Sequence, residues 1–198
     1  MNTLEDILMN KFRLSEGETS MILNHFKLYK IPKGTFLINE LQNEPDLFFL
    51  NQGLLREFYF YEEDGTTFEN TTELVMEDEF YLEIDSNINK NSNINLQAQI
   101  ASTVYRLDHQ KLKTMIENID QQNNSLWNTF LRRVLIERLA KLTRRRFIMG
   151  TSRKSSTRYS HFLKVFRPIT NLLSDKIIAS YLGLSQSTLS AQDKIEKR

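Results

Sequence analysis

The stretch SDKIIASYLGLSQSTLS, Ser174–Ser190, contributes most to the prediction of the fold. Ser174 is a good N-cap for a helix, because its side-chain oxygen can accept a hydrogen bond from an otherwise unpaired backbone N–H. Ala179 is small enough to let a second helix approach, and Gly183 can end the first helix in a left-handed conformation. Leu189 would anchor the second helix in the core. This spacing predicts a helix-turn-helix.

The second predicted helix shows short hydrogen-bonding side chains to solvent. Such side chains read base edges in the major groove of DNA. An ordinary αα-hairpin with the same apolar spacing is the alternative. The candidate DNA-binding residues are Lys176, Ser185, Gln186, Ser187, Thr188, Ser190 and Lys194.

Charge is divided unevenly along the chain. Residues 1–125 contain 10 Lys and Arg against 21 Asp and Glu, a net charge of −11. Residues 126–198 contain 16 against 4, a net charge of +12. Lys and Arg contacts with phosphate supply most of the non-specific affinity for nucleic acid. We therefore expect the basic part to bind double-stranded DNA. A basic helix that packs on the acidic half would explain some of these charges but not the whole excess.

Several classes of protein are excluded by composition. The chain has no cysteine, which excludes disulfides and cysteine-ligated metal centres. Its three histidines lie far apart, and no nucleophile–base pair or Gly-rich phosphate loop is present. No window approaches 18 consecutive apolar residues, and no signal peptide is recognisable. We expect a soluble cytoplasmic protein that is not an enzyme, carries no cofactor or metal, and does not bind a membrane.

The first two thirds of the chain predict short helices followed by strands. Residues 3–28 are helical in pattern, and Ser15 with Glu18 forms a capping-box motif. From residue 28 to residue 107 apolar residues alternate in several short runs, with a hairpin turn at 63–65 and an Asn-rich loop at 86–95. Short strands at this spacing indicate an antiparallel sandwich or barrel.

A long helix is predicted from about residue 125 to residue 147. A short helix at 109–116 precedes it, an exposed connection at 151–159 follows it, and a further apolar-periodic segment covers 159–166. The apolar face of the long helix is wide. It can be a single buried core helix, or it can also contact a partner helix. We favour the dimer, because a two-fold helix-turn-helix protein can bind two half-sites. The candidate dimer contacts are Trp127, Phe130, Leu131, Val134 and Leu135.

A β-domain, a long helix and a helix-turn-helix, in that order, resemble the Crp/Fnr family of bacterial transcription regulators. Residues 31–38 are similar to the opening strands of a cyclic-nucleotide-binding-type domain, and residues 48–56 to its strand–glycine–strand signature. Residues 178–190 are similar to the winged-helix motif of the family's Bacteroidetes-type members. The resemblance covers nearly the whole chain.

The resemblance implies an α+β chain in three parts. Residues 1–120 would form an antiparallel, jelly-roll β-barrel that is cyclic-nucleotide-binding-like, and residues 121–147 a dimerisation helix. Residues 148–198 would form the winged-helix-like helix-turn-helix domain that binds DNA.

One departure from the family pattern concerns the effector. No glycine follows Phe80, and Lys90 is the only basic residue between Phe80 and Val104. Five carboxylates between Glu77 and Asp85 would repel a phosphate, so we predict that cAMP and cGMP do not bind. The barrel would then be a scaffold or would hold an unknown small-molecule effector. The acidic cluster is interpreted as solvated loop residues or as a cation site. The candidate effector pocket is Arg56, Phe80, Tyr81, Leu82 and Glu83.

A second departure follows Ser190. Family members usually continue with an arginine and more basic residues, whereas this chain continues with Ala191, and Gln192 stands where an apolar residue is expected. Other basic residues would hold phosphates, namely Arg153, Lys154, Arg158, Lys176 and Lys194. The prediction is a homodimeric DNA-binding transcription regulator. The alternative is a ligand-sensing or protein-interaction module whose helix-turn-helix no longer reads DNA.

Overall fold

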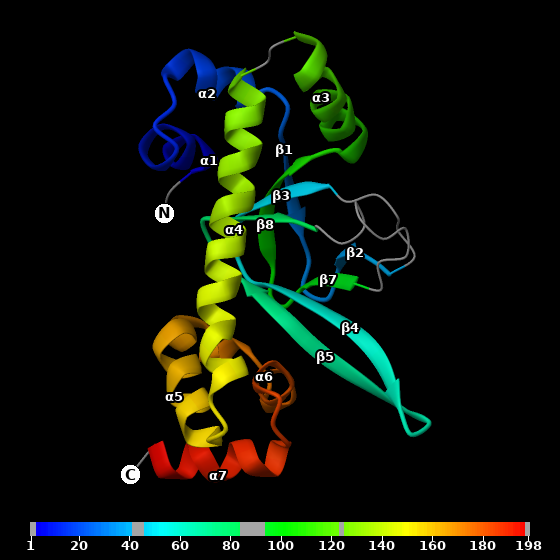
Figure 1. Cartoon of the computed structure of the whole chain (residues 1–198), viewed down its shortest axis with the longest axis vertical. Helices are drawn as coiled ribbons and strands as arrows, with labels where there is room; N and C mark the ends of the chain where they lie inside the picture. Colours follow the sequence, from blue (N-terminus) through cyan, green and yellow to red (C-terminus); the bar gives the residue numbers. More distant parts are fainter. Residues whose placement is uncertain (1–2, 41–45, 84–93, 123–124, 197–198) are drawn as a thin grey trace.

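A single long helix runs along the whole molecule. The computed structural model describes residues 3–40, 46–83, 94–122 and 125–196. Helix α4 (Ser125–Thr151) has 27 residues and is therefore about 40 Å long. Figure 1 shows the β-domain along one side of α4 and a helical C-terminal domain around its lower end. None of the described helices is long and apolar enough to cross a membrane.

The β-domain is a sandwich of two four-stranded sheets. One sheet has the order β1-β8-β3-β6 and the other β2-β7-β4-β5, with neighbouring strands antiparallel. The strands are β1 (Lys27–Ile31), β2 (Phe36–Ile38), β3 (Leu47–Gln52), β4 (Leu55–Glu63), β5 (Thr66–Val75), β6 (Glu79–Leu82), β7 (Ile94–Ala98) and β8 (Ser102–Leu107). Among the described residues no strand pair joins the two sheets, so they do not close into the predicted barrel.

Short helices precede the sandwich, as the sequence predicts. They are α1 (Leu4–Asp6), the π-helix η1 (Ile7–Lys11) and α2 (Glu16–Leu23). The capping box is confirmed at α2. The Ser15 backbone N–H donates to Glu18 Oε2 at 2.8 Å, and the Glu18 N–H donates to Ser15 Oγ at 3.4 Å. Strand β1 begins at Lys27, so the helical segment ends slightly earlier than predicted.

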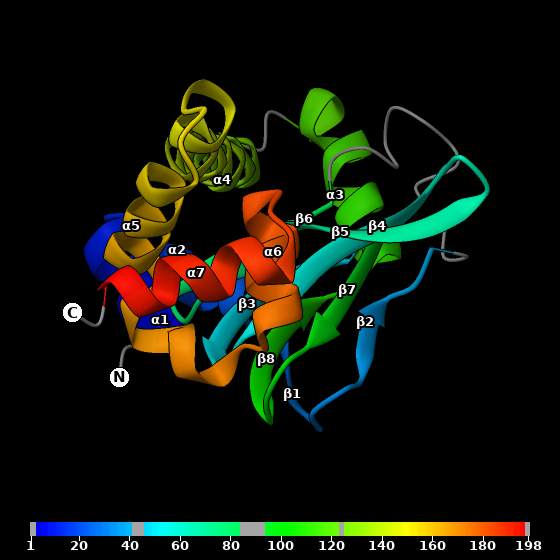
Figure 2. The ribbon, with the colours of Figure 1, turned by 90° about the horizontal axis from the view of Figure 1, so that it is seen from below.

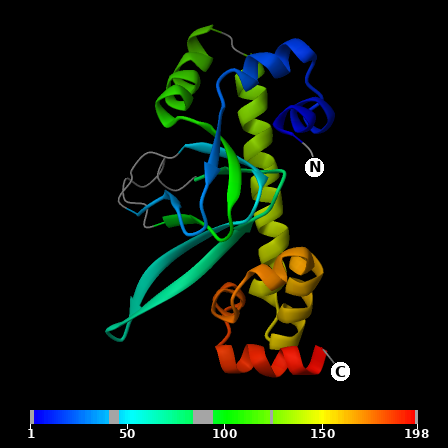
Figure 3. The same ribbon diagram turned by 180° about the vertical axis from the view of Figure 1, so that it is seen from behind.

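Two glycine turns fix how β4 enters and leaves its sheet. Gly53 has φ +115°, and a Cβ there would lie 2.1 Å from Ser102 Oγ, so the turn after β3 requires glycine. At the far end of β4, Asp64 (φ 49°) and Gly65 (φ 72°) form the predicted hairpin turn to β5. Figure 3 shows this hairpin projecting far beyond the rest of the sheet.

Several other segments begin or end at residues that differ from the predicted ones. Residues 86–93 of the predicted Asn-rich loop lie outside the described residues, whereas Ile94 and Asn95 already belong to β7. Helix α3 (His109–Gln122) is longer than predicted. Helix α5 (Ser155–Phe166) begins inside the predicted connection, which shrinks to residues 152–154, and the 3-10 helix η3 (Arg167–Leu172) follows. Helices α6 (Asp175–Leu182) and α7 (Gln186–Glu196) complete the chain.

The wide apolar face of α4 is buried within this chain. Phe130 and Val134 have no exposed surface, and Trp127 and Leu131 are buried with them. They pack against the N-terminal helices and the β-domain, where the Phe130 and Phe80 rings lie 5.6 Å apart. Of the five side chains predicted as dimer contacts, four are therefore core residues, and Leu135 is packed against the same core. A partner helix must meet other residues of α4.

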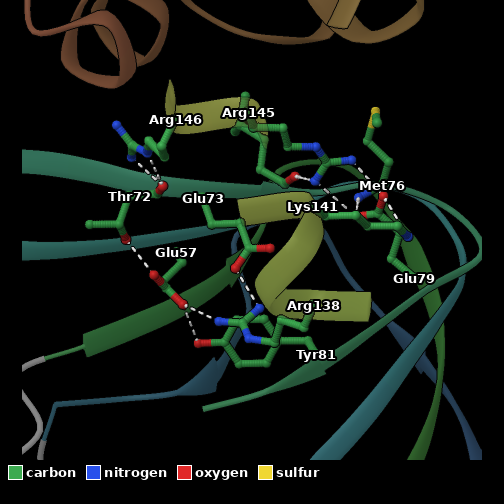
Figure 4. Close-up of polar contacts among 11 residues, drawn as sticks. Glu57, Thr72, Glu73, Met76, Glu79, Tyr81, Arg138, Lys141, Arg145 and Arg146 are labelled. Atoms are coloured by element: carbon green, nitrogen blue, oxygen red, sulfur yellow. Dashed lines mark hydrogen bonds and ion pairs between the residues drawn. The ribbon is translucent and has the colours of Figure 1, made fainter. Parts of the chain in front are cut away.

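Charged side chains on the same helix bind both sheets (Figure 4). Arg138 is ion-paired with Glu73 on β5 and with Glu57 on β4, where the Arg138 Nη2–Glu57 Oε2 distance is 3.0 Å. Seven residues further, Arg145 binds both carboxylate oxygens of Glu79 on β6, at 3.1 and 2.5 Å. All five side chains are buried. Charge-assisted, bidentate pairs of this kind fix geometry more strictly than apolar contact does.

The first prediction concerns this set of ion pairs. Arg138→Met would leave Glu57 and Glu73 buried without their cation, so we expect the free energy of unfolding to fall by about 3–5 kcal/mol. Urea unfolding followed by circular dichroism measures the loss. The control Lys113→Met removes an exposed cation of α3 rather than of α4 and should change stability by about 0.5 kcal/mol or less. Equal effects of the two variants would contradict the structural role of Arg138.

Candidate nucleic-acid interface

The helix-turn-helix predicted from Ser174–Ser190 is confirmed in its geometry. Ser174 Oγ accepts a hydrogen bond from the Ile177 N–H at 3.4 Å and caps α6. Gly183 ends α6 in the left-handed region with φ 62° and ψ 44°. Ser185 Oγ accepts from the Thr188 N–H at 3.1 Å and caps α7. The residues at the turn therefore adopt the conformations that the sequence predicts.

The two helices pack on α5 through a small core. Ala179, Leu182 and Leu189 are buried there together with Phe162 and Tyr181. Small Ala179 lies where α6 approaches its neighbours, as expected. On α7, the Tyr159 hydroxyl of α5 donates to Asp193 Oδ1 at 2.9 Å, which turns this carboxylate toward α5.

One face of α7 points away from the rest of the protein. Figure 2, seen from below, shows α7 at the near end of the molecule, in front of α5 and α6. Ser187, Ser190, Ala191 and Lys194 are exposed and share this face by their helical spacing. Gln186 is exposed at the start of the helix. This outer face is polar and has the width that a major groove admits.

The predicted DNA-binding residues do not all reach this face. Ser185 is committed to capping, and its hydroxyl also lies 2.9 Å from Ser187 Oγ and 2.8 Å from Thr188 Oγ1. Thr188 is partly buried. Lys176 belongs to α6, on the side toward the β4–β5 hairpin, where its Nζ lies 3.7 Å from Glu69. The outer face thus retains Gln186, Ser187, Ser190 and Lys194.

Much of the basic charge after residue 125 is neutralised or hydrogen-bonded within the chain. Arg146 donates to the carbonyl oxygens of Thr71, Thr72 and Tyr181. Arg158 donates to Leu182 O at 2.8 Å, so it supports the turn rather than being free for a phosphate. The described residues engaged in this way are Arg133, Arg138, Lys141, Arg145, Arg146 and Arg158, and the exposed Lys176 also pairs with Glu69. The alternative weighed from the sequence, a basic helix packed on the acidic half, is therefore correct for five of the seven α4 cations, whereas Arg132 and Arg144 are exposed.

Apart from Arg132 and Arg144 on α4, the basic side chains that remain exposed after residue 125 lie around α7 and α5. They include two that sequence reasoning missed, Lys164 and Arg167. Both line a hollow of about 720 Å³ with Asn171 and Asp193. Lys164 lies within the apolar-periodic segment 159–166, and Arg167 follows it directly. Their positive charge is the only feature of the sequence that could have marked them as DNA contacts. Among the residues of this domain that the structure describes, the exposed basic side chains are Arg153, Lys154, Lys164, Arg167, Lys176 and Lys194.

The five candidate effector-pocket residues do not surround one cavity. Phe80 and Tyr81 are neighbours on β6 and point to opposite sides. Phe80 packs against Phe12 and Phe130 under α4, whereas Tyr81 lies between the sheets and donates to Glu57 Oε2 at 2.7 Å. Arg56 is tied to Glu69 and Thr71 on β5. Leu82 is in the Phe80 core cluster, and Glu83 is buried.

The acidic cluster is only partly a group of solvated loop residues. Glu77 is exposed in the turn before β6, whereas Glu79 and Glu83 are buried, and Asp85 lies outside the described residues. Glu79 lies within β6, where its carboxylate contacts Lys141 Nζ at 3.1 Å as well as Arg145. Burial tends to raise the pKa of this carboxyl, but the hydrogen bonds and charge of Arg145 outweigh burial and hold the pKa below its usual value. Glu73 differs, because burial raises its pKa to about 7 despite the nearby Arg138. Glu79 therefore binds the α4 cations as an anion.

One other cluster has the residue types of a cation site. Asp46, Asp108 and His109 place their ligand atoms within 4.8 Å of one another. The Arg106 guanidinium already offsets part of the negative charge of this cluster, with Nε 2.6 Å from Asp46 and Nη2 3.6 Å from Asp108. The group is therefore an ion-pair cluster at the start of α3.

The second prediction tests the turn. Gly183→Ala forces a side chain into the left-handed region, so we expect a loss of about 1–2 kcal/mol in unfolding free energy. The space itself is adequate, since a Cβ would meet Arg158 Nη1 at 3.5 Å. The control Gly17→Ala, inside α2 with nothing within 4 Å of the new Cβ, should stabilise by about 0.5–1 kcal/mol. Thermal unfolding of both variants gives the sign of each change in unfolding free energy. If Gly183→Ala does not lower the stability, the assignment of Gly183 to the left-handed region is wrong.

Among the comparisons with known proteins, only the solved structures give matches. A scan against protein-family models finds no match, and a sequence search of curated proteins finds none either. Solved structures do match over most of the chain. A protein from Eubacterium rectale assigned to the crp/fnr family of transcriptional regulators superposes with a TM-score of 0.67 at 14% identity, covering 96% of this chain and 86% of that one.

Two further structures give the same result. A mutant of CooA from Carboxydothermus hydrogenoformans has a TM-score of 0.64 at 18% identity, covering 100% of this chain and 85% of that one. The c-di-GMP-responsive global regulator CLP from Xanthomonas campestris has a TM-score of 0.63 at 14% identity, covering 92% of both chains. At these identities the likeness establishes the fold. The chain has the architecture found in transcription regulators of the Crp/Fnr type.

Proposed function

We propose that this protein is a homodimeric, DNA-binding transcription regulator of the Crp/Fnr type. The observation that carries the proposal is the outer face of α7, which is polar, exposed and presented at the end of the molecule by a well-formed helix-turn-helix. The fold shared with known regulators supports it. We place the protein in the cytoplasm, where such a regulator meets DNA. The Bacteroidetes-type assignment rests on the residues of the helix-turn-helix alone.

In this proposal the contacts divide into two kinds. Gln186, Ser187 and Ser190 read base edges, because their short side chains can donate and accept in the major groove. The flanking cations, including Lys194 and Arg167, bind phosphates and set the register. The arginine that the family carries after the equivalent of Ser190 is replaced by Ala191. We therefore expect direct contacts with guanine to contribute less to the affinity for DNA, and contacts with phosphate to contribute more.

The dimer would form through the exposed face of α4. Ile136, Leu139 and Phe147 expose 61%, 51% and 62% of their surfaces, which is unusual for large apolar side chains on one helix. Ala140 and Thr143 line the same stretch and are small enough for a second helix to approach. A parallel two-fold pairing of this face would carry two copies of α7 on one side of the dimer.

The proposal assigns no cyclic-nucleotide effector to the β-domain. The ion-paired carboxylates Glu57, Glu73 and Glu79 lie where α4 meets the sandwich, and they support the expectation that cAMP and cGMP do not bind. A protein-interaction module that no longer reads DNA is the second candidate. The acidic residue Asp193 on α7 would favour this second candidate if it lay on the outer face, but its carboxylate is turned toward Tyr159 and away from that face.

The third prediction concerns phosphate contact. Lys194→Ala should weaken binding to every DNA sequence and reduce the salt dependence of log Kd by about 0.9, the loss of one phosphate contact. Fluorescence anisotropy over a salt series measures this slope. The control Lys111→Ala removes an exposed lysine on α3 in the effector domain, and the slope should not change. An unchanged slope for Lys194→Ala would argue against α7 as the contact face.

The fourth prediction concerns the dimer. Leu139→Glu places a charge in the proposed interface twice, once from each copy, so we expect dimer dissociation to become easier by about 100-fold or more. Size-exclusion chromatography with light scattering should then report a monomer. Gln110→Glu, an exposed position on α3, adds the same charge and should leave a dimer. A monomeric wild-type protein would contradict the proposal directly.

A further inference from the structure

The β4–β5 hairpin carries an unusual surface for a projecting element. Its turn begins with three consecutive exposed carboxylates, Glu62, Glu63 and Asp64. Behind them, Phe60, Tyr61 and Phe68 expose 43%, 40% and 42% of their surfaces. Figures 1 and 3 show the hairpin sloping toward the end of the molecule that α7 occupies. The acidic tip therefore lies on the same side as the proposed DNA-binding face.

The hairpin and the helix-turn-helix share a hollow of about 520 Å³. Phe60, Thr67, Phe68 and Glu69 line it from the hairpin, and Lys176, Ala179, Ser180, Leu184 and Gln186 line it from the other side. Two of these residues, Lys176 and Gln186, are among the proposed DNA contacts. The N-terminal end of α7 therefore borders the same hollow as the hairpin.

Specific contacts hold the hairpin in this position. β5 is an edge strand, so its outer backbone groups have no strand partner. The Ser180 hydroxyl of α6 satisfies two of them, since it accepts from the Thr71 N–H at 2.8 Å and donates to Glu69 O at 2.9 Å. Arg146 binds the next carbonyl oxygens on the same edge. The base of the hairpin and the first helix of the helix-turn-helix are therefore docked as one unit.

The charges in this arrangement oppose DNA. Glu69 lies 3.7 Å from Lys176 Nζ and partly neutralises a cation proposed for phosphate binding. Glu62 lies two residues beyond Phe60 on the strand, about 7 Å further along the hairpin. Phe60 lines the hollow that Gln186 also borders, so Glu62 adds its negative charge beyond the edge of that hollow. Exposed charges act over about a Debye length, which is about 10 Å at 0.1 M salt, so their repulsion of phosphate is strongest at low salt.

We infer that the β4–β5 hairpin is an acidic guard of the DNA-binding face, which weakens the binding of DNA while the hairpin is docked on α6. The inference rests on the proposed function and adds a regulatory element to it. Any ligand or partner that moved the hairpin from α6 would release Lys176 and raise DNA affinity.

The experiment compares two triply neutralised full-length variants. The guard variant is Glu62→Gln, Glu63→Gln and Asp64→Asn, and asparagine tolerates the positive φ of position 64. The control is Glu5→Gln, Glu16→Gln and Glu40→Gln, which removes the same charge from exposed positions outside the hairpin, two of them on α1 and α2 at the opposite end of α4. Both variants are compared with the wild type by fluorescence anisotropy on one duplex, after circular dichroism confirms that they fold.

We expect the guard variant to bind about five- to tenfold more tightly than the wild type at about 50 mM salt. This gain should shrink below about twofold at about 500 mM salt, because the repulsion is screened. The control should gain less than about twofold at either salt concentration. Equal gains in both variants, or a weaker guard variant, would overturn the guard while leaving DNA binding intact. Absence of DNA binding by the wild type and both variants would overturn the proposed function together with this inference.

Discussion

The structure depends on two arginines of α4 that are buried against carboxylates of the β-sandwich. Arg138 pairs with Glu57 and Glu73, and Arg145 pairs with Glu79, so one helix is tied to both sheets. An apolar face alone would let α4 slide or rotate by small amounts. Paired buried charges do not tolerate this, since a displaced arginine leaves a carboxylate desolvated and unpaired. The position of α4 in turn sets the position of the helix-turn-helix, because Arg146 reaches Thr72 on one side and Tyr181 on the other.

This arrangement changes how the charge of the chain is understood. The acidic first part and the basic second part are largely complementary to each other across the α4 interface. The cations left for a polyanion lie mainly in α5, η3, α6, α7 and the connection 152–154, while α4 keeps the exposed Arg132 and Arg144. The same interface brings buried carboxylates to the side of the sandwich that faces the long helix, so the proposal leaves no place for a phosphate-bearing effector among them. Regulation, in this account, acts through the contact between β5 and α6.

Local patterns in the sequence predicted most of the fold. The capping box at Ser15, the hairpin turn at Gly65 and the left-handed turn at Gly183 are each set by residues within a few positions, and all three are confirmed. What the sequence could not predict depends on pairs far apart in the chain. The periodicity of α4 shows an apolar face but not whether that face is covered by Phe12 and Phe80 or by a second copy. Likewise, an acidic residue such as Glu79 looks solvated until Arg145, 66 positions later, is placed beside it.

The central claim is that α7 reads DNA sequence, and one measurement tests it most directly. Fluorescence anisotropy would compare DNA from the upstream region of the gene with a scrambled duplex of the same length, at two salt concentrations. The account predicts tighter binding to the upstream duplex, with a preference that persists at the higher salt concentration, because base contacts do not depend on counterion release as phosphate contacts do. Equal binding to both duplexes that disappears at higher salt, or no binding at all, would contradict it.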